Sequence, residues 1–182
     1  MKNWDASIQI PINSEYILRI LEEKFAPNNN GNPMITLTAE IVSPTSVDVN
    51  GEDINIAGIK IPLYYVTQVM DENGNVDAEK TTAAQARVFN NASKKSIYQL
   101  FEIPITPDQY NNPPLGFVGK CVYARIRPDA KVKRDSPTAE DLKKGLKEGK
   151  VSVNPKTKKP IQTFYPKVED IYGLAETAIR PY

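Results

Sequence analysis

The chain has 182 residues and a formal net charge of +1, and its 40% hydrophobic content is enough for the core of one domain. Histidine is absent and Cys121 is the single cysteine, which excludes an internal disulfide and the usual zinc sites and disfavours acid–base catalysis. No apolar run approaches the roughly 20 residues that span a bilayer, and residues 1–5 lack the apolar centre of a signal peptide, so we expect a cytoplasmic protein without membrane attachment.

The first third of the chain has the pattern of a β-meander. Residues 14–25 suit either a helix or a strand, but the turn-rich residues 27–33 and the alternating residues 34–42 favour a hairpin. Asn50-Gly51 then predicts a tight turn before a β-rich run over residues 54–69. Within that run, Gly58 and Pro62 predict a bulge or an edge position.

The second half begins with a helical segment and ends with strands. Apolar residues recur at helical spacing over residues 78–101, which predicts one broken helix or two short ones. Residues 118–127 alternate, so Val122, Ala124 and Ile126 can enter a core while Tyr123, Arg125 and Arg127 share the opposite face. An ordinary half-solvated strand is the alternative interpretation of this pattern. A last strand is predicted over residues 161–168.

Charge is unevenly distributed along the chain. Residues 1–119 carry 8 Lys and Arg against 14 Asp and Glu, whereas residues 120–167 carry 14 against 5. Because salt screens charges separated by more than about 10 Å, a local positive excess indicates a polyanionic partner even where the total charge is near zero. Solvated surface lysines are the alternative.

The order of the predicted elements is that of an OB-fold, a small, partly open β-barrel. We therefore expect a mainly β fold, a five-stranded OB-fold-like barrel with a helical segment between strands 3 and 4 and a long basic loop between strands 4 and 5. Residues 1–175 would form this single domain, with a basic insertion at 128–160, and residues 176–182 a C-terminal tail.

The sequence resembles phage-encoded single-stranded DNA-binding proteins with an OB-fold. The residues that carry the resemblance lie in the first hairpin, at the start of strand 4 and in the last strand: 15–20, 31–37, 40–42, 115–120, 164–168 and 170–171. The resemblance implies a non-enzymatic protein without a cofactor that coats and protects single-stranded DNA in phage replication or recombination, with little sequence preference, in the host cytoplasm. Replication or recombination proteins are the further partners it implies. The tail departs from the acidic tails common in such proteins, because it has few acids and contains Arg180.

The candidate DNA-binding residues are aromatic rings that can stack on bases and cations that can meet phosphates. Parity allows only one ring of each neighbouring aromatic pair to face the core. The six cations that bracket the long loop would give an affinity that falls with salt at a logarithmic slope of about −4. The full set is Tyr64, Tyr65, Tyr123, Arg125, Arg127, Lys131, Lys133, Arg134, Lys156, Lys158, Lys159, Phe164, Tyr165 and Lys167.

Other features of the sequence favour structural roles. Asp71-Glu72 could contribute to a magnesium site, but the adjacent Asn-Gly-Asn residues are typical of a solvated turn, so no metal is expected. Trp4 is expected to pack against the end of the barrel, and Cys121 to be a buried thiol. Two other functions remain open: a virion structural or assembly protein that uses an OB-like barrel for protein contacts, and an inhibitor of a host factor.

Overall fold

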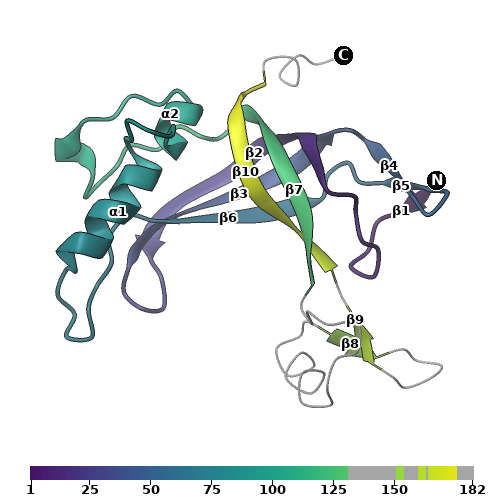
Figure 1. Ribbon diagram of the computed structural model, residues 1–182, viewed down its shortest axis with the longest axis horizontal. Coiled ribbons are helices and arrows are strands. Elements are labelled where there is room, and N and C mark those ends of the chain that lie inside the picture. Colours follow the sequence, from purple (N-terminus) through teal and green to yellow (C-terminus); the bar gives the residue numbers. More distant parts are fainter. Residues whose placement is uncertain (131–150, 154–159, 163, 176–182) are drawn as a thin grey trace.

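A five-stranded antiparallel sheet forms most of the fold. The computed structural model describes residues 1–130, 151–153, 160–162 and 164–175. Within these ranges the sheet has the strand order β10-β7-β2-β3-β6. Strands β7 and β10 cross the direction of the other three, so the sheet curls into a half-barrel (Figure 1). The strands are β2 (Asn13–Pro27), β3 (Pro33–Ser43), β6 (Lys60–Val66), β7 (Cys121–Ala130) and β10 (Phe164–Leu174).

The first hairpin agrees with the alternating pattern of the sequence. Strand β3 buries Ile35, Leu37, Ala39 and Ile41 completely and leaves the residues between them half-exposed. The side chain of Asn28 accepts hydrogen bonds from the backbone of the turn that follows β2, at 2.9 and 3.0 Å. Local hydrogen bonding by such a side chain is what makes Asn frequent in turns.

Two smaller sheets complete the strand inventory of the described residues. Strand β5 (Glu52–Asn55) pairs with β4 (Ser46–Val49) and, in parallel, with β1 (Lys2–Asn3); β8 (Val151–Val153) pairs with β9 (Pro160–Gln162). Asn50 and Gly51, which join β4 to β5, both have positive φ, as a two-residue hairpin turn of type I′ requires. This confirms the turn predicted from the sequence.

The β-rich run predicted over residues 54–69 is not one continuous strand, because a turn separates the end of β5 from the start of β6. Gly58 has a φ of 81° and lies in a turn, where its amide donates to the carbonyl of Ile41 at 2.9 Å. Strand β6 begins after this turn and forms ladder bonds only with β3 among the described strands. Pro62 is therefore in an edge strand, where a residue without an N–H is tolerated. The predicted edge position is confirmed.

The helical segment consists of two helices at one end of the half-barrel (Figure 1). Helix α1 (Ala78–Val88) begins after Asp77, whose carboxylate accepts from the backbone N–H of Lys80 at 3.0 Å. Helix α2 (Ile97–Leu100) begins after Ser96 with a capping box, and a 3₁₀ turn η1 (Pro107–Gln109) follows. Because side-chain caps satisfy the free N–H groups of a first turn, these boundaries follow from the local sequence.

Aromatic side chains close this end of the half-barrel. The ring of Phe89 stacks on Tyr110 at a centroid distance of 4.5 Å and contacts Tyr98 at 5.0 Å. Phe117 meets Tyr98 and Phe101 edge to face at 5.2 and 5.0 Å. Each such pair contributes roughly 0.5–1.5 kcal/mol beyond the burial of its surface. The rings join the two helices to the loop residues Tyr110 and Phe117 and pack in the main core.

Trp4 and Cys121 have the structural roles expected of them. Trp4 is half-buried, packs against the main core and donates from Nε1 to the carbonyl of Ile8 at 2.9 Å. Cys121 is fully buried with Ile17 and Ala175, and its burial raises the pKa of the thiol. Within the part of the chain that the structure describes, no helix is both long and apolar enough to cross a bilayer.

Candidate nucleic-acid interface

The outer face of β7 carries aromatic and cationic side chains together. Val122, Ala124 and Ile126 are fully buried, while Tyr123 is 38% exposed. Arg125 and Arg127 follow Tyr123 on the same outer face and are half-buried. The alternation predicted from the sequence is therefore confirmed for this strand.

Strand β10 places further side chains beside those of β7. In the antiparallel register, Lys167 lies opposite Arg127, and Tyr165, two positions earlier, is 37% exposed. Pro166, between them, is buried, so Tyr165 and Lys167 point outward. We call the outward side chains of these two strands the cationic face: Tyr123, Arg125, Arg127, Tyr165 and Lys167.

Two irregularities in the β7–β10 register add residues to this face. The register shifts around Glu169 and around Tyr172. Glu169 accepts from Nε of Arg125 at 2.8 Å, so one cation of the face is paired with a carboxylate. Tyr172 is 48% exposed and lines a hollow together with Tyr123. Tyr172 was missed by the sequence prediction because the strand was expected to end at residue 168, although Asp170-Ile171-Tyr172 could have extended it.

Arg127 is the least satisfied side chain of the cationic face. Its Nε is buried, and no hydrogen-bond partner for it exists among the described residues. A buried donor without a partner costs roughly 1–3 kcal/mol. Lys167 directly across the ladder adds a like charge, which is destabilising at this spacing. An anion bound at this position would compensate both effects.

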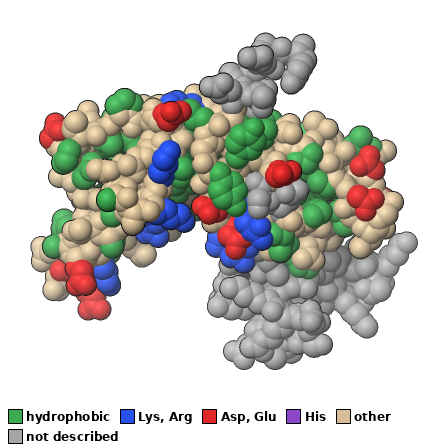
Figure 2. Space-filling view, turned by 45° about the horizontal axis from the view of Figure 1, so that its top comes forward, with side chains coloured by type: hydrophobic (Ala, Val, Ile, Leu, Met, Phe, Trp, Pro, Cys, Tyr) green, Lys and Arg blue, Asp and Glu red, His purple; other side chains and the backbone are tan. Residues whose placement is uncertain are grey.

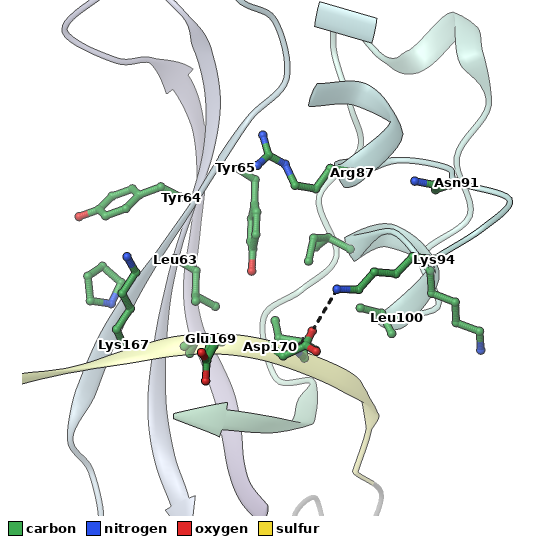
Figure 3. Close-up of a pocket in the computed structure, with 15 residues that line it drawn as sticks. Leu63, Tyr64, Tyr65, Arg87, Asn91, Lys94, Leu100, Lys167, Glu169 and Asp170 are labelled. Atoms are coloured by element: carbon green, nitrogen blue, oxygen red, sulfur yellow. Dashed lines mark hydrogen bonds and ion pairs between the residues drawn. The ribbon is translucent and has the colours of Figure 1, made fainter. Parts of the chain in front are cut away.

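A groove opens between the two edge strands of the half-barrel. Strands β6 and β10 approach one another there, and the groove between them has a volume of about 420 Å³. In Figure 3, Tyr64 and Lys167 lie on one side, Arg87, Asn91 and Lys94 on the helical side, and the ring of Tyr65 projects between them. Nζ of Lys94 lies 3.7 Å from Oδ1 of Asp170 across this opening. We call this feature the seam groove.

The seam groove continues toward the cationic face. The hollow lined by Tyr123 and Tyr172 has a volume of about 460 Å³ and shares Lys95 and Leu100 with the seam groove. Figure 2 shows Lys and Arg side chains around the middle of one face, together with Asp and Glu side chains and beside hydrophobic side chains, and further Asp and Glu side chains at both ends. Rings and positive charges from different elements thus share one connected surface.

The neighbouring tyrosines of β6 point to opposite faces of the sheet, as alternation along a strand requires. Tyr64 is 61% exposed, whereas Tyr65 packs against the main core and lines the floor of the seam groove. Burial raises the pKa of the Tyr65 hydroxyl well above its usual range. One ring is therefore available to a ligand and the other is mainly structural.

Phe164 lies apart from the cationic face. It is half-buried and lines a different hollow, with Ile8, Val49 and Glu52. Its amide donates to the carbonyl of Ala6 at 2.7 Å, which ties the start of β10 to the N-terminal segment. The other ring of this aromatic pair, Tyr165, is the outward one. The structure therefore brings together only some of the predicted rings.

The other predicted cations belong to the long basic segment of the sequence. Lys131, Lys133, Arg134, Lys156, Lys158 and Lys159 lie outside the described residues, as does the tail over 176–182. Lys120, at the start of the basic part of the sequence, is directed inward, and its Nζ donates to the carbonyl of Phe101 at 2.8 Å. The positive charge of this region is thus partly used within the fold.

Asp71 has a turn-stabilising role. Its Oδ1 accepts from the backbone N–H groups of Asn73 and Asn75 at 2.8 and 2.9 Å. Over the residues that the structure describes, no three His, Cys, Asp or Glu side chains are grouped closely enough to hold a metal ion.

Comparison with family models, with curated proteins and with solved structures finds no match for this chain.

Proposed function

We propose that this protein binds single-stranded DNA, coating and protecting it with little sequence preference during phage replication or recombination. The observation that carries the proposal is the cationic face, where Arg127 and Lys167 are opposed and Tyr123 and Tyr165 are exposed beside them. Rings stack on bases of any sequence and cations meet phosphates, which is the chemistry of non-specific single-strand binding. A binding protein rather than an enzyme fits a chain without histidine.

The strand order supports an OB-fold assignment. Numbered in chain order, β2, β3, β6, β7 and β10 lie side by side as 5-4-1-2-3, with the helices between the third and fourth strands. The barrel would then be open between its third and fifth strands, where the seam groove lies. OB-folds bind oligonucleotides on the face of strands 2 and 3 and through adjacent loops, and Tyr64 lies on the third strand.

Titration of labelled oligothymidylate, followed by fluorescence anisotropy at two salt concentrations, tests the proposal. We expect micromolar or tighter binding that weakens with salt, by about 0.7 logarithmic units per phosphate contact for each decade of salt. A duplex of the same length should bind more weakly, because its stacked bases are not accessible to the tyrosine rings. Indifference to oligothymidylate, or equal affinity for duplex, would contradict the proposal and favour a role in protein contacts.

A further inference from the structure

The seam groove shares Lys167 with the cationic face, but its other lining residues come from different elements. Its helical side comes from α1 and the loop that follows, through Arg87, Asn91 and Lys95, and its strand side from β6 and β10, through Tyr64 and Lys167. In Figure 3, Tyr64 and Lys167 lie on one side and Arg87 on the other, with the ring of Tyr65 between them. It is thus a pocket between separate elements, whereas the cationic face is a surface along two strands.

The groove has more positive charge than its own carboxylates neutralise. Asp170 is 3.7 Å from Lys94, and Glu169, which also lines the groove, pairs with Arg125 on the neighbouring strand. No carboxylate lies within ion-pair distance of Arg87, Lys95 or Lys167 in the described ranges. Three cations, from α1, from the loop that follows it and from β10, therefore line one groove, and among the described residues none of them has a carboxylate within ion-pair distance.

The size and the lining of the groove suit a single nucleotide. A volume of about 420 Å³ lies toward the lower end of the roughly 300–1,000 Å³ range of small-molecule pockets. Tyr64, 61% exposed, offers a ring for base stacking, and Asn91 offers the N–H donors of its side-chain amide, whose oxygen accepts from Ser93. A longer stretch of strand would have to leave this volume and follow the adjoining surface.

The charge of the groove favours a terminal phosphate over an internal one. A phosphodiester carries one negative charge, whereas a phosphomonoester carries about 1.5 to 2 at neutral pH because its second pKa is near 6. The three cations Arg87, Lys95 and Lys167 match the more highly charged group. Arg87 can in addition bind two phosphate oxygens at once.

We propose that the seam groove is a subsite for a nucleotide that ends in a phosphomonoester. The proposal rests on the proposed function where the nucleotide is the end of a bound strand. A free nucleoside monophosphate carries the same phosphomonoester and is the other ligand that the groove could take.

The test compares a short oligothymidylate with a terminal phosphate, at the 5′ or the 3′ end, against the same strand with hydroxyl ends. At pH 7.5 one phosphorylated strand should bind about tenfold more tightly, the range expected for added charge-assisted hydrogen bonds. The preference should decrease toward pH 5.5, as the monoester becomes singly charged. The protein has no histidine, and the charged or titratable groups facing the groove are lysine, arginine, tyrosine and carboxylate side chains: Arg87, Lys94, Lys95, Tyr64, Tyr65, Lys167, Glu169 and Asp170.

Variants locate the effect in the groove. Arg87→Gln and Lys95→Gln should each bring the ratio of the affinity for phosphate-ended to that for hydroxyl-ended oligothymidylate toward one. Lys80→Gln is the matched control, because Lys80 is exposed on α1 and does not line the groove, so its ratio should stay near the wild-type value. Equal affinity of wild-type protein for phosphate-ended and hydroxyl-ended strands would overturn the proposal.

Thymidine monophosphate serves as the second probe. If thymidine monophosphate displaces the phosphorylated oligothymidylate from wild-type protein but not from Arg87→Gln, the groove accepts a free nucleotide. If the mononucleotide does not compete, the phosphomonoester that the groove binds is the end of a DNA strand. If hydroxyl-ended and phosphate-ended oligothymidylates bind with the same affinity, this inference is refuted and the proposed function remains intact. Failure of all strands to bind would refute the proposed function, and the inference would then stand only if the mononucleotide binds.

Discussion

Arg127 of β7 and Lys167 of β10 face each other across the antiparallel ladder, and both project from the outer face of the half-barrel. Like charges at directly opposed positions destabilise a sheet, by up to about 1 kcal/mol. The buried Nε of Arg127, which has no partner among the residues described, adds a further cost. A sequence that retains this pair gives up stability at a surface position, as binding sites for anions commonly do.

Replacement of Arg127 by Met should therefore separate stability from binding. Arg127→Met removes the unsatisfied donor and the like-charge contact while keeping the apolar part of the side chain, so the free energy of unfolding should rise by about 1 kcal/mol. Urea titration should show a higher midpoint with an unchanged slope. Affinity for oligothymidylate should fall in the same variant.

Arg125→Met is the matched control for this substitution. Arg125 is on the same face but pairs with Glu169 at 2.8 Å, so its removal should not stabilise the fold. A loss of stability in Arg127→Met equal to that in Arg125→Met would contradict the interpretation of Arg127 and Lys167 as an anion-binding pair.

Tyr123→Ala tests stacking independently of charge. Loss of the ring should weaken binding of oligothymidylate by roughly 1–3 kcal/mol, while the dependence of affinity on salt should stay the same because no cation is removed. Tyr123→Phe keeps the ring and should bind almost as tightly as wild type. A changed salt dependence in Tyr123→Ala, or an equal loss in Tyr123→Phe, would show that the hydroxyl or the local fold matters instead.

The strands and helices follow from local patterns in the sequence. Alternation in β3 and β7, the Asn50-Gly51 turn and the caps of α1 and α2 all involve residues close together in the chain. Each pattern determines its own element without knowledge of the partner strand. The alternation of side chains along β6 also limits Tyr64 and Tyr65 to two arrangements, with one ring inward and the other outward.

The seam groove could not be predicted, because it depends on long-range register. The approach of Arg87, Lys95 and Lys167 requires β10 to pass along β6 with helix α1 beside them, and no local pattern gives that arrangement. The register shifts at Glu169 and Tyr172 were equally hidden, since a bulge moves a side chain to the other face without a distinctive sequence signal. Phe164 was grouped with the interface because alternation alone does not tell which of Phe164 and Tyr165 points outward.

Lys120 should behave differently from the other basic residues. Its ammonium group donates to the carbonyl of Phe101 at 2.8 Å, so Lys120→Met would leave that oxygen without its charged donor. We expect a loss of roughly 1–3 kcal/mol in the free energy of unfolding and no change in the salt dependence of DNA binding. Lys80→Met, which removes an exposed lysine of α1, controls for the change in net charge and should alter stability little. A reduced salt dependence in Lys120→Met would place Lys120 at the interface.

Alkaline pH should destabilise the protein through its buried tyrosines. Tyr16 is fully buried and donates to the carbonyl of Pro11 at 2.8 Å, and burial raises its pKa from 10.0 to about 12. Burial and the nearby carboxylate of Glu23 also raise the pKa of Tyr98. Below pH 10 both folded and unfolded states keep these protons, so stability is unaffected there.

Between pH 10 and about 12 the unfolded chain releases the Tyr16 proton while the folded chain retains it, so the free energy of unfolding decreases as pH rises. The limiting slope is about 1.4 kcal/mol per pH unit for each tyrosine. Urea midpoints measured at pH 9 and pH 11 should show this decline. Tyr16→Phe loses a hydrogen bond and should be about 1 kcal/mol less stable at pH 9, but its decline should be shallower, so the two proteins converge at pH 11. Parallel declines in the two proteins would mean that Tyr16 ionises equally in the folded and unfolded states.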